Sequence, residues 1–309
     1  MSTCASRSER LCGDVLRRYL RTKWPGRTRV TGYLAQRIRL LQHVPVNIGS
    51  GQTLFLDLRD GMCRDVLRDS PYVDHPWEPD EQQVIRRFVR AGDVALDVGS
   101  HFGEHAALIA SLVGPTGRVI AFEPNPERLD ALRRTVGQYG NGEVLPYAVS
   151  NQAEEAVLFV PEFHSKASLA NWDPSGTVRR IRCGQVTIDA LIANRTIPQP
   201  DFIKCDVEGA ELLVFEGAKA TLDRRDAPIV MYEANLAAAR AFGCTVSAST
   251  DFLRRLAAAA FCFYWVQPEG ALRPFRELPQ QVEFFNLVAV PAARRDQLRI
   301  AAGSIERSD

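Results

Sequence analysis

The stretch VALDVGSHFG, residues 94–103, decides the fold of this chain. Its first five residues form a short apolar strand pattern that carries the carboxylate of Asp97, and Gly99 and Gly103 follow closely. Glycine permits a tight turn and a close approach of the backbone to a ligand. A helical pattern, Ala106–Val113, comes next. The order of strand, glycine turn and helix is typical of an open α/β sheet, in which ligands bind beyond the carboxyl ends of the strands.

Strand-like and helix-like segments alternate outward from this stretch. The predicted strands are Thr53–Leu58, Val94–Val98, Val119–Glu123, Glu143–Val149, Phe202–Val207, Pro228–Glu233, Cys262–Val266 and Val282–Val290, with Ala156–Val160 and Arg182–Ile188 as inserted strands. The predicted helices are Glu81–Arg90, Ala106–Val113, Pro126–Tyr139, Ala210–Leu222 and Asp251–Ala260. Near-continuous apolar strands separated by helices indicate a parallel sheet that is covered on both faces. We therefore predict a doubly wound, Rossmann-like α/β fold.

The C-terminal end of the sheet is expected to differ from the rest. About 15 residues, including Gly270 and Pro274, join the last two predicted strands without a helical pattern. Such a connection predicts an antiparallel hairpin at one end of the sheet. The sheet is thus mostly parallel with an antiparallel C-terminal strand. We expect an N-terminal extension at residues 1–80, with a basic helix-like segment and short strands, a main domain at 81–295 and a tail at 296–309.

The composition excludes several classes of protein. The chain has 309 residues, a net charge of +1 and 46% hydrophobic residues, which excludes a wholly disordered chain and an overall nucleic-acid charge signature. The longest apolar run, Leu256–Val266, is too short to span a bilayer. The N-terminal residues contain no apolar stretch of the kind found in secretory signals, so no secretory signal is expected. The seven scattered cysteines contain no CxxC pair, so we expect reduced thiols, a cytoplasmic location and no zinc site.

Positive charge is concentrated at the N-terminus. Residues 1–40 contain ten basic and two acidic residues, a local net charge of +8, which leaves −7 for the remainder. Leu11, Val15, Tyr19 and Leu20 recur near helical spacing with arginines between them. The pattern predicts a helix with a solvated basic face. A surface that attracts an anionic partner, a substrate carrier or a membrane face is the alternative.

Two carboxylates at predicted strand ends indicate a nucleoside cofactor. Asp97 ends the first strand of the main domain, and Glu123 ends the next, where it can accept hydrogen bonds from both ribose hydroxyls. The dinucleotide fingerprint GxGxxG and the phosphate loop GxxxxGK[ST] are both missing, and residues 97–103 contain no lysine or arginine. A cofactor that lacks phosphate and has a cationic amino-acid end suits this acidic turn. S-adenosylmethionine (SAM) has these properties.

Three motifs together resemble a known family. Asp97–Gly103 resembles the first motif of class I SAM-dependent methyltransferases, and Val119–Asn125 (VIAFEPN) resembles their second. Ile203–Glu211 (IKCDVEGAE) is very similar to the IKIDVEGAE signature of the FkbM-type methyltransferases. The likeness extends from about Leu54 to Pro291, including the DLRD segment at residues 57–60 and TIDAL at 187–191.

The resemblance implies roles for individual residues. The implied cofactor-binding residues are Asp97, Gly99, Ser100, His101, Phe102, Gly103, Glu123, Asn125, Ala148 and Asp206. Asp97, Gly99 and Gly103 would hold the methionine end of SAM and Glu123 the ribose. Asn125 would hold the neighbouring edge of the nucleoside, and Ala148 would lie near the adenine. His101 stands where related sequences usually carry Gly or Asn, but His also occurs in left-handed backbone conformations, so we expect the turn to form.

The family resemblance predicts methyl transfer to a hydroxyl oxygen of a sugar, polyketide or other secondary-metabolite acceptor. Methyl transfer requires in-line positioning, and a general base within hydrogen-bond reach assists a weakly nucleophilic hydroxyl. Asp206 and Glu208 are the candidate catalytic residues, and Asp206 is preferred. Glu208 stands at the predicted entrance of a helix, whose N-terminus is expected to lower its basicity. In the alternative, both carboxylates only hold their loop together.

Other functions remain open on the sequence alone. An N-methyltransferase is one alternative, although no Asn/Asp-Pro-Pro-Tyr/Phe motif follows the Phe202–Val207 strand. A catalytically degenerate SAM-binding interaction protein is the other. His101 and His105 occur in HFGEH, which is not HExxH, so no metal ligand is predicted. A polar loop follows the Ala156–Val160 strand and is expected either to bind the acceptor or to be solvated. It contains His164, Ser165, Lys166 and Ser168. The expected partner is a small-molecule hydroxyl acceptor, without nucleic acid or a membrane span, and the sequence allows a homodimer.

Overall fold

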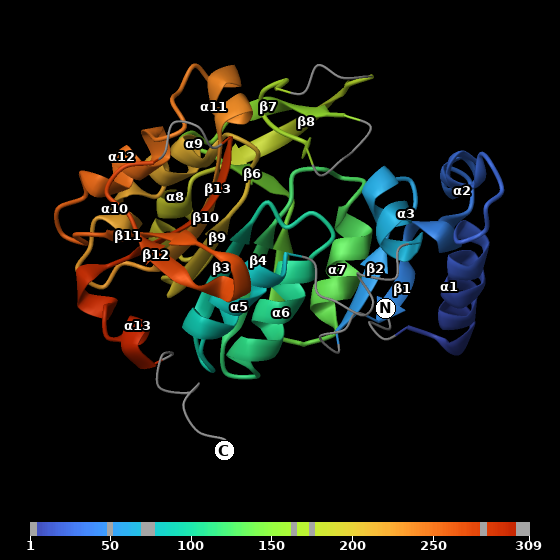
Figure 1. Ribbon diagram of the computed structural model, residues 1–309, viewed down its shortest axis with the longest axis horizontal. Helices are drawn as coiled ribbons and strands as arrows, with labels where there is room; N and C mark the ends of the chain where they lie inside the picture. Colours follow the sequence, from blue (N-terminus) through green and yellow to red (C-terminus); the bar gives the residue numbers. More distant parts are fainter. Residues whose placement is uncertain are drawn as a thin grey trace.

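An eight-stranded sheet runs through the centre of the molecule (Figure 1). The computed structural model describes residues 5–47, 52–68, 78–161, 166–172, 177–278 and 283–300. The strands lie side by side in the order β12 (Leu272–Pro274), β11 (Cys262–Val266), β13 (Phe284–Val290), β10 (Ile229–Asn235), β9 (Phe202–Cys205), β3 (Val94–Val98), β4 (Arg118–Phe122) and β5 (Gly142–Leu145). The predicted α/β fold is confirmed.

The parallel part of the sheet brings three loops to one edge. Strands β10, β9, β3, β4 and β5 are parallel to one another. Val98, the last residue of β3, is paired with Phe122 of β4 and with Cys205 of β9. The residues that follow these strands therefore leave the sheet at the same edge. The register places the predicted site loops together.

Helices cover both faces of the sheet, as the apolar strands predict. One face packs against α5 (Pro79–Phe88), α6 (Glu104–Val113) and α7 (Leu129–Gly137). The other face packs against α8 (Ile188–Ala193), α9 (Glu211–Glu216), α10 (Lys219–Leu222) and α12 (Ala248–Arg254). The helix expected at Ala210–Leu222 is therefore two helices. The chain bends at Gly217, where a Cβ atom would overlap the carbonyl oxygen of Ser150.

The strand expected at Glu143–Val149 is divided between two sheets. Its first part is β5, and its second part is β6 (Tyr147–Val149) in a three-stranded sheet with β8 (Arg179–Val186) and β7 (Glu155–Val160). Pro146 separates the two strands. Proline has no N–H group to donate to a ladder, so the pairing is interrupted there. The single strand predicted here is wrong, whereas the two inserted strands predicted after it are present.

The C-terminal strands form the expected antiparallel arrangement, with one correction. β13 pairs antiparallel with both β10 and β11 and so lies inside the sheet. The short strand β12, which the sequence did not predict, forms the outer edge beside β11. Two further short helices lie between these strands: α11 (Leu236–Ala241) follows β10, and η3 (Pro268–Gly270) lies in the hairpin connection. After β13, the described part of the chain ends with η4 (Ala292–Arg294) and α13 (Gln297–Ile300).

The N-terminal region is more regular than predicted. It contains α1 (Arg7–Leu20), α2 (Arg27–Ala35), η1 (Arg39–Gln42), an antiparallel pair of β1 (Val44–Asn47) and β2 (Thr53–Leu56), and α3 (Gly61–Arg68). Leu20 of α1 is buried, but Leu11 and Val15 are 65% and 58% exposed, so the predicted apolar face of this helix is only partly correct.

This region shares an apolar core with the main sheet domain. Leu20 and Ala35 are buried in one cluster with Phe102 and Ala107, which belong to the turn after β3 and to α6. The backbone N–H of Phe55 in β2 also donates to Thr135 Oγ1 of α7 at 3.0 Å. The division of the chain at residue 80 stays a prediction. In the described part of the chain, no helix combines the length and apolar character needed to cross a membrane.

Candidate active site

Two adjoining cavities lie beyond the carboxyl ends of β3, β4 and β9. The larger cavity has a volume of about 460 Å³ and extends to Glu78, Trp172 and Glu233. The smaller cavity is bounded by the end of β4 and by the small sheet, and Glu123 and Ala148 line it. Four residues line both cavities: Gly99, His101, Asp206 and Glu208. Two molecules bound in the two cavities would therefore meet at these four residues.

The turn after β3 requires its glycine. Gly99 has a φ of 86°, and a Cβ atom there would overlap the carbonyl oxygen of Asp206. The turn after β3 and the loop after β9 thus approach each other more closely than a side chain at residue 99 would permit. His101 has a φ of 49°, which is the left-handed conformation expected for a residue that replaces Gly or Asn.

Glu123 is held in place by two backbone donors. Its Oε1 atom accepts from Asn125 N at 2.8 Å, and its Oε2 atom accepts from His101 N at 2.9 Å. Burial raises the pKa of this carboxyl group. Each oxygen of a carboxylate has two lone pairs, so each can accept one further hydrogen bond. The geometry thus leaves acceptor capacity on a pre-oriented group beside the smaller cavity.

The structure brings most of the predicted cofactor residues to a cavity wall, but not all of them. Ser100 and Phe102 line the larger cavity. Asp97, Gly103 and Asn125 line neither. Asp97 lies just beneath the turn, fully buried, and neither of its carboxylate oxygens has a hydrogen-bond partner among the described residues. Burial raises its pKa. The charge of Lys204 acts on this buried carboxylate and favours its ionised form.

The side chain of His101 is oriented by a residue to which the sequence analysis gave no role. His101 Nε2 lies 2.9 Å from Asp60 Oδ2, and Arg128 Nη2 lies 3.3 Å from the same oxygen. Asp60 and Arg128 are both almost completely buried. Asp60 belongs to the DLRD segment, which was the only sign of it in the sequence. The N-terminal region thereby positions one residue of the turn after β3.

Asp206 stands between the cavities with Lys204 beside it. Lys204 Nζ lies 3.0 Å from Asp206 Oδ2, and both side chains reach the larger cavity. Burial alone would lower the pKa of Lys204, but Asp206, Asp97 and Glu81 raise it well above its usual value. No sequence pattern indicated a role for Lys204, because this residue lies within an apolar strand pattern, although Lys at this position is part of the family signature.

Glu208 differs from the sequence expectation. Burial and the neighbouring Asp206 and Glu211 carboxylates raise its pKa to about 9. The predicted helix N-terminus does not offset this effect, because α9 begins only at Glu211. Glu211 itself occupies the loop, where its Oε1 accepts from Val207 N at 3.1 Å and from Gly209 N at 3.2 Å. This environment therefore favours the protonated form of Glu208.

Acidic groups outnumber basic groups around the larger cavity. Its acidic lining residues are Asp65, Glu78, Glu104, Asp206, Glu208 and Glu233, and its lysines are Lys166 and Lys204. Burial, followed by the charge of Asp206, raises the pKa of Glu233. Glu104 is buried and the other five acidic residues are half-buried. Such crowding of carboxyl groups with raised pKa values is typical of functional sites. Trp172 and Asn235 also line this cavity, and no motif in the sequence indicated either of them.

The polar loop before Ser168 is partly described. His164 and Ser165 lie outside the described residues. Lys166 lines the larger cavity, and Ser168 Oγ donates to the carbonyl oxygen of Glu208 at 2.8 Å. The inserted small sheet therefore contacts the loop after β9 and contributes one cation to the cavity.

The model of the FkbM methyltransferase domain matches residues 97–261. The chain belongs to the FkbM methyltransferase family. The match confirms the class predicted from the three motifs, a SAM-dependent methyltransferase with SAM as its methyl donor. The matched residues begin at Asp97, near the end of β3, and include β9 and the loops that follow both strands. They leave out the N-terminal region that positions His101.

Named relatives match parts of this methyltransferase. The hexuronic acid methyltransferase AglP of Haloferax volcanii is 32% identical over 166 residues, which is 50% of this chain and 64% of the relative. A protein-L-isoaspartate O-methyltransferase of Methanopyrus kandleri is 32% identical over 118 residues, 35% of this chain and 52% of the relative. The chain thus spans less than two thirds of the length of these relatives.

Solved structures with similar arrangements include two other methyltransferases. A precorrin-6y C5,15-methyltransferase from Geobacter metallireducens has a TM-score of 0.38 and 12% identity, covering 68% of this chain and 87% of its own. A SAM-dependent O-methyltransferase from Thermotoga maritima has a TM-score of 0.36 and 14% identity, covering 69% of this chain and 66% of its own.

Proposed function

We propose that this methyltransferase transfers the methyl group of SAM to a hydroxyl oxygen of a sugar. The observation that carries the proposal is the position of Asp206 at the boundary of the two cavities. A nucleoside in the smaller cavity and an acceptor in the larger one would meet at its carboxylate. Enclosing both molecules favours the in-line geometry that methyl transfer requires.

The residues present fit SAM. Glu123 would bind the ribose hydroxyls through the lone pairs that its two backbone donors leave free, and Ala148 would adjoin the adenine. Gly99 lets the turn after β3 approach the Asp206 carbonyl closely at the wall that the two cavities share. The negative charge of Asp97, beneath this turn, would attract the ammonium group of the cofactor. Asn125 would hold the turn beneath the nucleoside through its Oδ1, which accepts from Glu127 N.

Asp206 is the proposed general base. Bound SAM supplies an electrophilic methyl group. Asp206 would accept the proton of the acceptor hydroxyl as the oxygen forms its bond to the methyl carbon and the sulfur–carbon bond breaks. Lys204 Nζ, 3.0 Å from Oδ2, orients the carboxylate. Glu208, with its pKa raised to about 9, is protonated at neutral pH and would donate a hydrogen bond to the acceptor.

The lining of the larger cavity supports a sugar acceptor. Trp172 offers an aromatic face, and its Nε1 is buried without a hydrogen-bond partner among the described residues. Glu233 and Asn235 supply further hydrogen-bonding groups for hydroxyls. Lys166 Nζ lies 5.3 Å from the centre of the Trp172 ring and adds a positive charge at this wall. The name of the AglP relative, a hexuronic acid methyltransferase, supports a sugar acid, whose carboxylate Lys166 would attract.

The location and assembly of the enzyme are part of the same proposal. The six cysteines in the described ranges have free thiols, which supports a reducing compartment such as the cytoplasm. A small-molecule acceptor requires only the larger cavity, whereas a polymer would extend beyond it. A homodimer stays a prediction.

Labelled SAM tests the proposed reaction. The purified protein is incubated with SAM carrying a labelled methyl group and with the methyl glycosides of glucuronic acid and glucose, a phenol and a primary amine as acceptors. We expect label in a sugar product that survives mild base, because a methyl ether is stable where a methyl ester is hydrolysed. A base-labile product would assign the transfer to the sugar carboxylate.

The same assay separates the other functions. Label in the amine alone would identify an N-methyltransferase. SAM binding measured by calorimetry, together with no labelled product from any acceptor, would support the degenerate SAM-binding protein. Either result contradicts the sugar hydroxyl as the acceptor.

A further inference from the structure

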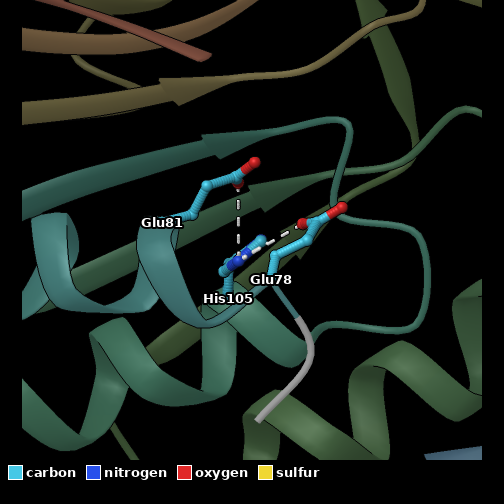
Figure 2. A group of neighbouring side chains, drawn as sticks. All are labelled: Glu78, Glu81 and His105. Atoms are coloured by element: carbon cyan, nitrogen blue, oxygen red, sulfur yellow. Dashed lines mark ion pairs between the residues drawn. The ribbon is translucent and has the colours of Figure 1, made fainter. Parts of the chain in front are cut away.

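Three side chains converge at the start of two neighbouring helices, and two of them, Glu78 and His105, line the larger cavity. Glu78 precedes α5, Glu81 lies in its first turn, and His105 lies in the first turn of α6 (Figure 2). His105 Nε2 is 3.7 Å from Glu78 Oε2 and 3.7 Å from Glu81 Oε2. One ligand atom from each residue lies within 4.8 Å of those of the other two. No motif in the sequence joins these residues, because Glu78 and His105 are far apart along the chain.

His105 supplies the observation that separates this group from an ordinary acidic cluster. The residue is only 6% exposed, and its Nε2 has no hydrogen-bond partner in the described part of the chain. Figure 2 shows this nitrogen directed at the two carboxylates. A buried polar atom without a hydrogen bond is rare, because its loss of solvation is not compensated. The imidazole is therefore aimed at a position that a ligand can fill.

The spacing of the three groups suits a shared cation. Imidazole nitrogen and carboxylate oxygen bind Zn²⁺ at about 2.0–2.2 Å, which places two ligand atoms of one ion roughly 3–4 Å apart. The two distances of 3.7 Å from His105 Nε2 fall in this range. One nitrogen and two carboxylate donors suit a transition metal such as Zn²⁺ or Mn²⁺ rather than Ca²⁺, which prefers an all-oxygen site.

The surrounding charge also favours a cation here. Glu78 and His105 line the larger cavity, together with the Asp206, Glu208 and Glu233 carboxyl groups. The lysine in this part of the cavity, Lys204, makes its ion pair with Asp206 at 3.0 Å. Additional positive charge would thus relieve the repulsion among the acidic groups.

We propose that Glu78, Glu81 and His105 form a binding site for a divalent transition-metal ion, with Zn²⁺ or Mn²⁺ as the preferred ions. Three protein ligands leave coordination positions open, and two of these ligands, Glu78 and His105, line the larger cavity. An acceptor with adjacent oxygen atoms would complete the coordination and be oriented by it. This second role rests on the proposed sugar acceptor, whereas metal binding itself does not.

Metal binding is tested without SAM or acceptor. The full-length protein is treated with a chelator, desalted and titrated with Mn²⁺, with free Mn²⁺ measured by electron paramagnetic resonance, and separately with Zn²⁺ by calorimetry. We expect one saturable site. Glu81→Gln and His105→Gln should each weaken binding by more than the roughly 10–100-fold that loss of an outer-shell contact costs. Glu155→Gln, on an exposed carboxylate of β7, is the matched control and should bind the ion like the parent.

The outcomes separate this proposal from the proposed function. Circular dichroism melting and SAM binding of each variant establish that it is folded. Parental SAM binding with loss of metal binding supports the site. No saturable binding of either ion by the parent protein, or unchanged binding in both folded variants, overturns it. Because SAM affinity and methyl transfer are measured separately, a failure of the metal site leaves the transferase proposal standing, and the reverse also holds.

Discussion

Two buried polar clusters lie on either side of the turn after β3, and they differ in how their charges are compensated. In the first, Asp60 contacts both His101 and Arg128, at 2.9 and 3.3 Å. In the second, Lys204 pairs with Asp206 while the Glu81, Glu208 and Glu233 carboxyl groups have raised pKa values. The compensated cluster positions the turn. The acidic cluster retains repulsion that bound cations, protons or an acceptor can relieve, which is expected where a ligand binds.

Breaking the compensated cluster should have the largest effect on stability. Arg128→Met leaves the carboxylate of Asp60 buried without the guanidinium group that lies 3.3 Å from its Oδ2. Removing one partner of a buried pair destabilises a protein by about 3–5 kcal/mol. We expect a loss of this size in urea unfolding. Arg182→Met, which removes an exposed pair with Glu155 at 3.9 Å, is the control and should change the unfolding free energy by less than about 1 kcal/mol. Equal effects of the two variants would contradict the comparison.

The acidic cluster should affect catalysis more than stability. Asp206→Asn removes the proposed base, and we expect single-turnover methyl transfer to fall by about 10²-fold or more. Glu208→Gln should retain most of the rate, because the amide replaces a carboxyl group that is already uncharged at neutral pH. SAM affinity and thermal melting establish that both variants are folded. If Asp206→Asn transfers methyl at the parental rate, positioning alone becomes the leading mechanism.

Asp97 lies between the two clusters and should act on cofactor binding. Asp97→Asn retains the shape of the side chain and removes the charge that would attract the ammonium group of SAM. Loss of a charge-assisted hydrogen bond costs about 1–3 kcal/mol. Calorimetry with SAM should show this loss, whereas Asp130→Asn, on the exposed side of α7, should bind SAM like the parent. Parental affinity in Asp97→Asn would remove Asp97 from the cofactor site.

The acidic cluster also predicts how stability depends on pH. The pKa values of Glu208 and Glu211 rise from an ordinary 4.5 to about 9 and about 7 in the folded protein. The folded state therefore holds more protons than the unfolded state between pH 4.5 and these values. Each group should make the free energy of unfolding fall as pH rises through this window, by up to about 1.4 kcal/mol per pH unit. Glu208→Gln should flatten the fall measured by urea unfolding, most clearly between pH 7 and 9. A slope that is the same in the variant would contradict the assignment.

His101 should give the smallest effect. His101→Asn retains a residue that tolerates the left-handed conformation, and Arg128 still compensates Asp60. We expect SAM affinity to stay within about tenfold, or 1.4 kcal/mol. His101→Val, which is strained at a positive φ, should lose more SAM affinity than His101→Asn. That difference would identify the backbone conformation as the cause of the loss. A loss well beyond tenfold in His101→Asn would instead give the imidazole a direct contact with the cofactor.

Local sequence patterns were sufficient for the fold and for the family. Apolar strand runs alternating with helical patterns predicted the doubly wound sheet, because strand and helix periods are properties of short segments. The motifs around Asp97, Glu123 and Asp206 predicted the SAM-dependent methyltransferase class, which the family match confirmed. The missed division at Pro146 was also visible locally, since proline cannot donate to a strand ladder.

Contacts between distant segments were decided only by the tertiary structure. Asp60 meets His101 and Arg128, and Glu78 and Glu81 meet His105, through packing that no local pattern encodes. The same holds for the protonation of Glu208. The sequence placed it beside a helix N-terminus and predicted a weak base, but burial next to Asp206 and Glu211 raises its pKa to about 9. The sequence thus determined which carboxylates reach the sheet edge. The folded structure determined their charge, because desolvation and repulsion depend on every neighbour that the fold brings near.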